Sequence, residues 1–278
     1  AVCNGDSSEW SLISNFKTIL DCGANTYSIV ELTTGTSSAS ALPFYASANY
    51  YPKAKSWQIV TAQEMEMEGM YAGNIYSGGF QYDGGSPISP DVRVYLANTT
   101  LATMGTADTL GASQMTLVYE GPALFSNGST WSVINFTTPF AYTGGNVMLA
   151  VERTTNLSAS GSFKYDPGVS GVNRSVYKYD GSWSSSIYPS AYRNNLRFEG
   201  CTTIPSCPRP SDVVISNIQP TQVDVAWTSN GTSFAIAYGP HGFSMDSVNA
   251  YQIANSTTNS TTLTGLTEGM RYDIYVRA

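Results

Sequence analysis

The chain has 278 residues, enough for one large or two ordinary domains. Charged residues make up only 12% of it, about half the share usual in soluble domains, so Ser, Thr, Asn and Tyr must supply much of the polar surface. A net charge of −7 with scattered basic residues argues against nucleic acids and anionic membrane surfaces as partners, and no apolar run is long enough to insert into a bilayer.

The first 39 residues are expected to form an N-terminal extension. Between Trp10 and Leu20, apolar residues recur at roughly three-to-four spacing, which predicts one short, Ser-rich helix. The start of the chain shows no charged-then-apolar leader, so we expect that a signal peptide, if the protein is exported, has been removed.

Residues 40–203 show the alternation of apolar and polar side chains that is typical of short strands. Glu64–Glu68 alternates acids with methionines, and we interpret it as a strand with three carboxylates on one face. The other predicted strands are 56–60, 74–82, 92–96, 115–119, 131–136, 147–151, 175–179 and 195–198. Short strands joined by Gly, Asn, Ser and Pro turns predict an all-β fold, an antiparallel jelly-roll β-sandwich.

A change in composition marks a domain boundary. Residues 201–210, with the sequence CTTIPSCPRP, contain closely spaced prolines, which cannot continue a central strand and which stiffen a linker. We therefore expect a second, smaller β-domain over residues 204–278.

Four cysteines suggest an oxidising, extracellular environment. Three connectivities are open, and sequence alone cannot choose among them. Local pairing, Cys3–Cys22 and Cys201–Cys207, is the simplest. The alternatives are four free thiols or, with less support, a zinc site.

The segment from Pro208 to the end resembles a fibronectin type III domain. Val223–Trp227 matches the second strand of that family, with Trp227 at its core position, and Tyr272 occupies the tyrosine-corner position. The resemblance implies an immunoglobulin-like β-sandwich. The family's seventh strand has no counterpart after Val276–Ala278, so this second sandwich is expected to be incomplete.

Residues 40–200 also resemble a known module. The stretch Trp131–Val151, together with Leu42–Pro43 and Gln58–Val60, is similar to the jelly-roll, cleaved-adhesin and MAM-like domains of bacterial surface proteins exported by the type IX pathway. This resemblance implies a secreted or cell-surface location and a role in adhesion or ligand display.

The sequence gives little support for a catalytic site. The chain has a single histidine, His241, in a Gly-Pro-His-Gly sequence that the resemblance makes a turn. Glu64, Glu66 and Glu68 form the densest carboxylate group, but they are expected to alternate along one strand rather than to face each other across a cleft. The prediction is that the protein is not an enzyme.

No cofactor is predicted. Turn aspartates could hold a structural calcium ion, which requires oxygen ligands, but turn formation is the commoner explanation for aspartates at such positions. These aspartates are Asp83, Asp91, Asp166 and Asp180.

Aromatic residues with polar neighbours are the candidate binding residues, because they offer flat apolar faces beside hydrogen-bonding groups. The alternative to a binding role is that most of these rings pack inside the sandwich. The candidates are Trp183, Tyr188 and Tyr192 in one Ser-rich stretch, and Tyr45, Tyr50 and Tyr51 in another.

Two short sequences resemble the Asp-Ser/Thr-aliphatic O-glycosylation motif of the same bacterial group. They place the modified hydroxyls at Thr109 and Ser247.

The leading hypothesis is a secreted, non-catalytic adhesion or binding protein. Its ligand, a glycan or a surface protein, is expected on the jelly roll, with the fibronectin-like domain as a spacer. One alternative is that these are accessory tail domains of a larger secreted hydrolase. A second follows from the strand at Arg271–Ala278, whose open edge should be covered by further chain or by a strand donated by a neighbouring molecule, which would make the protein an assembly subunit.

Overall fold

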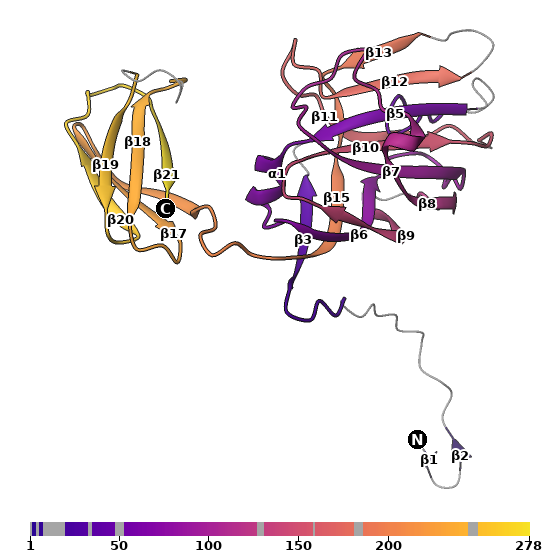
Figure 1. Ribbon diagram of the computed structural model, residues 1–278, viewed down its shortest axis with the longest axis horizontal. Coiled ribbons are helices and arrows are strands. Elements are labelled where there is room, and N and C mark those ends of the chain that lie inside the picture. The colour runs from indigo at the N-terminus through magenta and orange to yellow at the C-terminus, as the bar shows by residue number, and fades with distance from the viewer. Residues whose placement is uncertain are drawn as a thin grey trace.

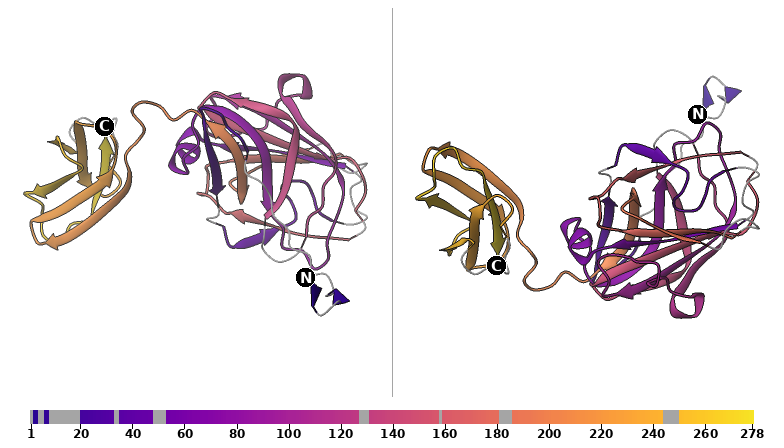
Figure 2. Two further views of the ribbon diagram at one scale, coloured as in Figure 1. Left: turned by 90° about the horizontal axis from the view of Figure 1, so that it is seen from below. Right: turned by 90° about the horizontal axis from the view of Figure 1, so that it is seen from above.

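The computed structural model describes residues 2–3, 6–7, 20–32, 35–47, 53–126, 131–157, 159–180, 186–243 and 250–278. Within these residues the chain is all-β, as predicted, and its antiparallel sheets form two lobes joined by an extended linker (Figures 1 and 2). The predicted helix at 10–20 lies almost wholly outside the described residues. In the described part of the chain, neither helical segment has the length or the apolar run needed to cross a membrane.

The strands of the first domain overlap nearly all of the predicted ones, and several more were not foreseen. They are β3 (Thr26–Leu32), β4 (Ser37–Ala39), β5 (Lys53–Val60), β6 (Gly73–Gln81), β7 (Asp91–Thr99), β8 (Thr116–Pro122), β9 (Trp131–Tyr142), β10 (Asn146–Arg153), β11 (Phe163–Asp166), β12 (Ser175–Asp180), β13 (Ile187–Ser190), β14 (Arg193–Asn194) and β15 (Leu196–Thr202). A short 3-10 turn, η1 (Ala112–Gln114), precedes β8, and β1 (Val2–Cys3) pairs with β2 (Asp6–Ser7) near the N-terminus.

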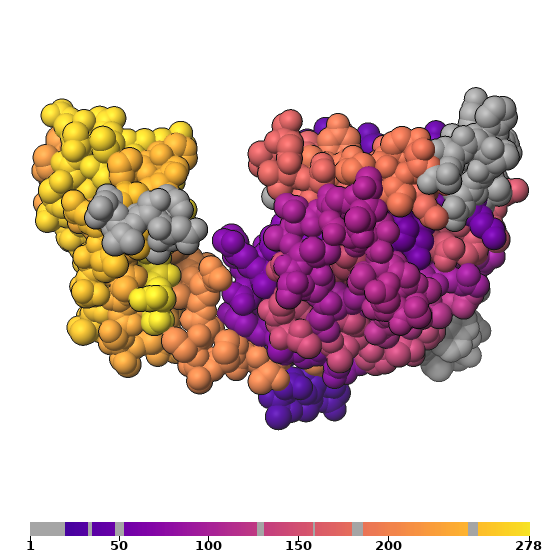
Figure 3. All heavy atoms as spheres, turned by 45° about the horizontal axis from the view of Figure 1, so that its top comes forward, coloured from indigo at the N-terminus to yellow at the C-terminus, as the bar shows by residue number. Residues whose placement is uncertain are grey.

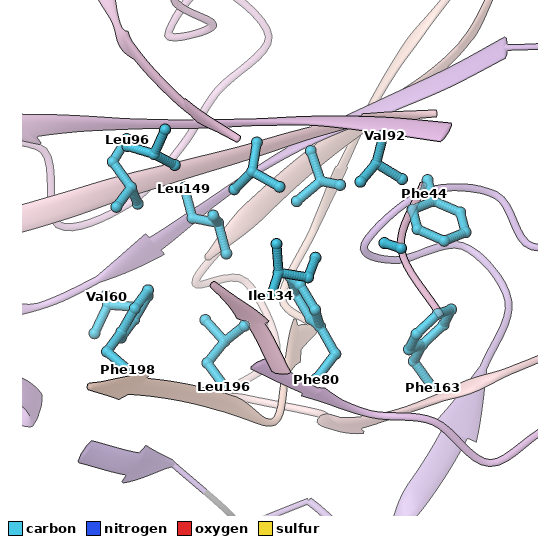
Figure 4. Close-up of a cluster of buried hydrophobic side chains, with 14 of the residues drawn as sticks. Phe44, Val60, Phe80, Val92, Leu96, Ile134, Leu149, Phe163, Leu196 and Phe198 are labelled. Atoms are coloured by element: carbon cyan, nitrogen blue, oxygen red, sulfur yellow. The ribbon is translucent and has the colours of Figure 1, made fainter. Parts of the chain in front are cut away.

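The first domain is a sandwich of two main sheets. A six-stranded sheet has the order β13-β12-β5-β10-β7-β8, a four-stranded sheet has the order β3-β15-β6-β9, and the short sheet β14-β11-β4 completes the domain. Between the sheets lies an apolar core in which Leu149 and Val92 of the larger sheet come near Leu196 and Phe80 of the smaller one (Figure 4). Alternation along each strand sends every second side chain into this core.

The outer face of the six-stranded sheet is also covered. Trp57, Ile59 and Met148 are almost fully buried under the segment of residues 100–115. The indole Nε1 of Trp57 donates a hydrogen bond to the carbonyl of Leu110 at 3.0 Å, which fixes that segment on the sheet. Burial on both faces explains why every residue of β5 from Ser56 to Val60 is buried, polar Ser56 and Gln58 included, rather than every second one.

The prediction of a strand at Glu64–Glu68 was wrong, because this segment begins inside a helix. Helix α1 spans Ala62–Met67 and starts with a capping box, in which the Thr61 hydroxyl accepts the Glu64 N–H and the Glu64 carboxylate accepts the Thr61 N–H. Met65 is fully buried whereas Met67 is 68% exposed, so the two methionines do not share one buried face.

The predicted disulfides were also wrong. Cys22 is bonded to Cys201, and Cys207 is exposed and free, so neither Cys3–Cys22 nor Cys201–Cys207 forms. The reason is tertiary. Strand β15 pairs antiparallel with β3 in a register that sets Cys201 opposite Tyr27, which brings Cys22 close although 179 positions separate the two cysteines. Strands β3 and β4, drawn from the first 39 residues, are thus integral parts of the first domain's sheets.

The second domain follows a linker at residues 203–210. Its strands are β16 (Ser211–Gln219), β17 (Gln222–Thr228), β18 (Phe234–Pro240), β19 (Gln252–Ser256), β20 (Ser260–Thr264) and β21 (Tyr272–Arg277). They form two three-stranded sheets, β16-β17-β20 and β19-β18-β21, around a separate core. Figure 3 shows the two lobes as distinct masses joined through the linker, where Arg209 contacts Glu66 of α1 at 3.1 Å.

Candidate functional site

Four tyrosines gather where β12 and β13 form the edge of the six-stranded sheet. Tyr177 lies directly opposite Tyr188 in the strand register, and their rings stack with centroids 5.5 Å apart. Tyr179, two positions along β12 and therefore on the same face, lies 5.7 Å from both of these rings. Tyr45 packs edge-on against Tyr179 at 4.7 Å. The result is a continuous aromatic cluster, which we call the tyrosine cluster.

Next to this cluster is a cleft of about 620 Å³, within the size range of small-ligand sites. The neighbouring sheet β14-β11-β4 contributes Tyr165, and the turn before β14 contributes Tyr192, whose ring lies 4.5 Å from that of Tyr165. Tyr177 brings the tyrosine cluster to the same cleft. Its lining is Ala39, Ala41, Leu42, Phe163, Tyr165, Pro167, Gly168, Ser170, Gly171, Asn173, Tyr177, Pro189, Ser190, Ala191, Tyr192 and Asn194.

Buried polar contacts hold the Tyr192 side of the cleft. The Gln58 and Asn194 side chains are both fully buried, and Gln58 Nε2 donates to Asn194 Oδ1 at 2.9 Å while Gln58 Oε1 accepts the Asn194 N–H at 2.8 Å. The hydroxyl of Ser175 donates to the carbonyl of Tyr192 at 2.6 Å. The backbone that carries Tyr192 is therefore tied to the centre of the large sheet.

An ionic network supports the other loops around the cleft. The carboxylate of Glu64 in α1 binds Arg193 at 2.7 Å and also contacts Arg174, and Arg174 lies 3.4 Å from Asp166. Asp166 also accepts the N–H of Gly168 at 2.9 Å, which shapes the turn after β11. Burial alone would raise the pKa of Glu64, but Arg193, the Thr61 N–H and Arg174 outweigh it and hold this pKa below its usual value.

The structure places three of the six predicted binding residues in this region. Tyr192 lines the cleft, Tyr188 stacks on a lining residue, and Tyr45 joins the tyrosine cluster at its far end. Tyr188 and Tyr192 are 37% and 42% exposed, so neither is an ordinary core residue. The remaining candidates, Trp183, Tyr50 and Tyr51, lie outside the described residues.

Sequence reasoning missed Tyr165, Tyr177 and Tyr179. The alternation of Tyr177 and Tyr179 about Lys178 was a usable signal, because it puts both rings on one face of a strand. No comparable signal existed for Tyr165, whose contact with Tyr192 depends on β11 joining β14.

The other sequence candidates lie elsewhere. His241 Nδ1 is 2.8 Å from Asp273 at an exposed turn of the second domain, whose Gly242 N–H also binds that carboxylate. Thr109 lies in the segment that covers the large sheet, and its glycosylation stays a prediction; Ser247 is outside the described residues.

The described residues contain no group of three or more His, Cys, Asp or Glu side chains that could hold a metal ion. The Asp83 carboxylate contacts the Ser38 hydroxyl, the Asp166 carboxylate belongs to the ionic network, and the backbone carbonyl of Asp91 accepts the Thr154 N–H. The side chain of Asp180 is outside the described part.

The second domain has the features that its sequence suggested. Trp227 is 5% exposed and packs edge-on against Phe234 at 5.2 Å, and the hydroxyl of Tyr272 accepts the N–H of Thr267 at 2.9 Å, which forms the tyrosine corner. Residues 208–278 match the family model of the fibronectin type III domain. The C-terminal lobe is a fibronectin type III domain.

No curated protein matches the sequence of the chain. Among solved structures, a clostridial cysteine protease, Cwp84, is 10% identical with a TM-score of 0.36, and the match covers 64% of this chain but only 40% of the protease chain. A two-domain fibronectin type III segment of chicken tenascin is 10% identical with a TM-score of 0.22, over 73% of this chain and 89% of that one. A β-glucuronidase from Faecalibacterium prausnitzii is 12% identical with a TM-score of 0.26, over 96% of this chain and 46% of the enzyme chain. At these scores the likenesses do not extend to function.

Proposed function

We propose that this protein is an extracellular, non-catalytic binding protein, in which the first domain binds a glycan in the tyrosine-lined cleft and the fibronectin type III domain is a spacer. The observation that carries the proposal is the convergence of Tyr165, Tyr177 and Tyr192 on one cleft. The buried Cys201 in its disulfide and the fibronectin type III domain support an extracellular setting.

The chemistry of the cleft suits a sugar. One face of a pyranose ring is made of C–H groups and packs on an aromatic ring, while its edge carries hydroxyls that need hydrogen-bonding partners. The cleft offers both, since tyrosine rings lie beside Ser170, Asn173 and Ser190. Its tyrosines are held by packing and backbone contacts, so little side-chain entropy is lost when a ligand binds.

The test is a glycan array followed by calorimetry with the best glycan. Tyr192→Ala should weaken binding by about tenfold or more, the effect expected for an aromatic contact at the centre of a site. Tyr188→Ala removes the ring that stacks on the lining residue Tyr177 and should weaken binding as well. Tyr275→Ala is the matched control, because Tyr275 is a similarly exposed tyrosine on the second domain, at 47%. The proposal fails if the array is blank, or if Tyr192→Ala and Tyr188→Ala both bind as tightly as the wild type.

A second candidate function is self-association through β21. In the described residues, β21 pairs with β18 on one side and with no strand on the other. Strand β16 of the other sheet lies on the same side of the sandwich as this open edge, and its Val213 and Ile215 are 44% and 42% exposed. Unpaired strand edges of this kind recruit further strands.

The sequence of β21 suits pairing with a second copy of itself. If two β21 strands pair antiparallel about Tyr275, Asp273 lies opposite Arg277 of the second copy, and Ile274 lies opposite its Val276. Each position therefore meets a complementary one, as a two-fold interface requires.

Analytical ultracentrifugation over a wide concentration range tests this second candidate. Arg277→Glu should shift the equilibrium toward monomer, whereas Arg271→Glu, the same charge change just before β21, should not. A wild-type protein that stays monomeric throughout would rule the self-association out.

A further inference from the structure

Among the residues that the structure describes, the lining of the cleft contains no charged side chain. All its residues are apolar, aromatic, hydroxyl-bearing or amide-bearing. Two arginines and an aspartate lie close behind it, and each of them forms an ion pair within the protein. Arg174 and Arg193 share the carboxylate of Glu64, and Asp166 binds Arg174 and the N–H of Gly168.

The position of these arginines is informative. Arg193 belongs to β14, directly before the lining residue Asn194, yet its side chain is only 2% exposed and is directed to Glu64. Arg174 directly follows the lining residue Asn173 and is 16% exposed. Two guanidinium groups adjacent in sequence to the cleft are thus withheld from its surface.

We infer that the ligand of this cleft is a neutral oligosaccharide that lacks carboxylate, sulfate and phosphate groups. This inference rests on the proposed glycan-binding function and narrows it. A charged group moved from water into the cleft loses hydration, and the described lining offers no opposite charge in return. Sugar hydroxyl groups lose less hydration free energy than charged groups do, and Ser170, Asn173 and Ser190 can form hydrogen bonds with them.

The arrangement of the rings indicates a ligand longer than one sugar. Tyr165 and Tyr192 form one aromatic pair at the cleft, and Tyr177 with Tyr188 forms a second, carried by a different sheet. The cleft of about 620 Å³ is larger than a single pyranose fills. Two aromatic pairs therefore suit neighbouring sugar units of a short chain.

The experiment compares matched neutral and acidic probes on the intact protein. Neutral probes are glucose, mannose and xylose and the cello-, manno- and xylo-oligosaccharides of two to four units, and acidic probes are oligogalacturonides, sulfated galactans and sialylated oligosaccharides. We expect binding to a neutral probe that grows by about tenfold from one to two or three units. The dissociation constant should change little between about 50 mM and about 500 mM salt, because no ion pair is screened.

Ser170→Lys adds a cation to the rim of the cleft at an exposed lining residue. It should raise affinity for the acidic probes by several-fold and make that binding salt-sensitive, while Ser170→Gln, an uncharged change at the same place, should not. If Ser170→Lys brings no such gain, the missing cation is not what excludes acidic glycans, and the inference is wrong.

Different results would contradict the glycan-binding site and the neutral-ligand inference. Wild-type preference for acidic probes that is lost in Tyr192→Ala would overturn the neutral-ligand inference and leave glycan binding in this cleft intact. Glycan binding that Tyr192→Ala and Tyr188→Ala leave unchanged would remove the site itself. Binding only to a surface protein, with every glycan probe blank, would overturn both.

Discussion

Glu64→Gln is the most informative single change in the first domain, because it removes one charge and little else. Glutamine can still take the third position of the capping box with Thr61, so helix α1 keeps its start. What disappears is the carboxylate that Arg193 binds at 2.7 Å and Arg174 also contacts. Arg193 is then left buried, at 2% exposure, without its counter-charge.

The size of the effect follows from that burial. Removing one partner of a buried ion pair typically costs about 3–5 kcal/mol. Because Glu64 itself is 24% exposed and water can reach it, we expect the lower end, about 3 kcal/mol. For a domain of this size that corresponds to a fall of roughly 6–12 °C in the first domain's Tm, measured by differential scanning calorimetry.

The effect should depend on pH with a definite sign. The folded-state pKa of Glu64 lies below its unfolded value, so its stabilisation is complete above the unfolded pKa of about 4.3 and is lost as pH falls through the folded pKa. The gap in unfolding free energy between wild type and Glu64→Gln should therefore be full at neutral pH and close in acid.

Glu120→Gln is the control. It breaks the Arg93–Glu120 pair, which has the same 2.7 Å distance but side chains 41% and 53% exposed, and should cost no more than about 1 kcal/mol. If Glu64→Gln destabilises the domain no more than Glu120→Gln does, or if its effect persists unchanged in acid, the reasoning about this network is wrong.

Three further predictions concern stability. Peptide mapping should find Cys22 joined to Cys201 and Cys207 alkylated without reductant, and the loss of a cross-link over 179 positions should cost up to roughly 5 kcal/mol in denaturant titrations. Trp227→Ala should cost about 3–5 kcal/mol in the second domain's calorimetric transition and leave the first domain's transition in place. Gly200→Ala should destabilise the first domain by about 1–3 kcal/mol, because the new Cβ would stand 2.5 Å from a backbone carbonyl oxygen of β6; an unchanged midpoint would contradict the pairing of β15 with β6.

Local patterns were enough for much of the fold. Alternation of apolar and polar residues located most strands of the first domain, since a half-buried strand imposes a period of two on its own sequence. Trp227 and Tyr272 identified the fibronectin type III domain because that sandwich needs a large core ring and a corner hydrogen bond at set positions. The aromatic candidates Tyr188 and Tyr192 also came from local composition.

Local patterns failed where an acid/Met alternation imitated a strand. The Glu64 carboxylate has two roles: it caps helix α1, and it contacts two arginines. Only the contacts with the arginines depend on residues far along the chain. The capping-box signature Thr61-x-x-Glu64 was present in the sequence and competed with the alternation.

Pairing between strands that are distant in sequence determined the disulfide and the aromatic contacts at the cleft. Cys22 meets Cys201 because β3 lies beside β15, and Tyr165 meets Tyr192 because β11 lies beside β14. Residues so far apart share no local pattern, since strand register is set by which apolar faces the two sheets bury against each other. The sequence by itself determined the class of fold, the division into two domains and the kind of side chain available for binding, while the tertiary structure alone decided which tyrosines share a cleft and which charges are kept out of it.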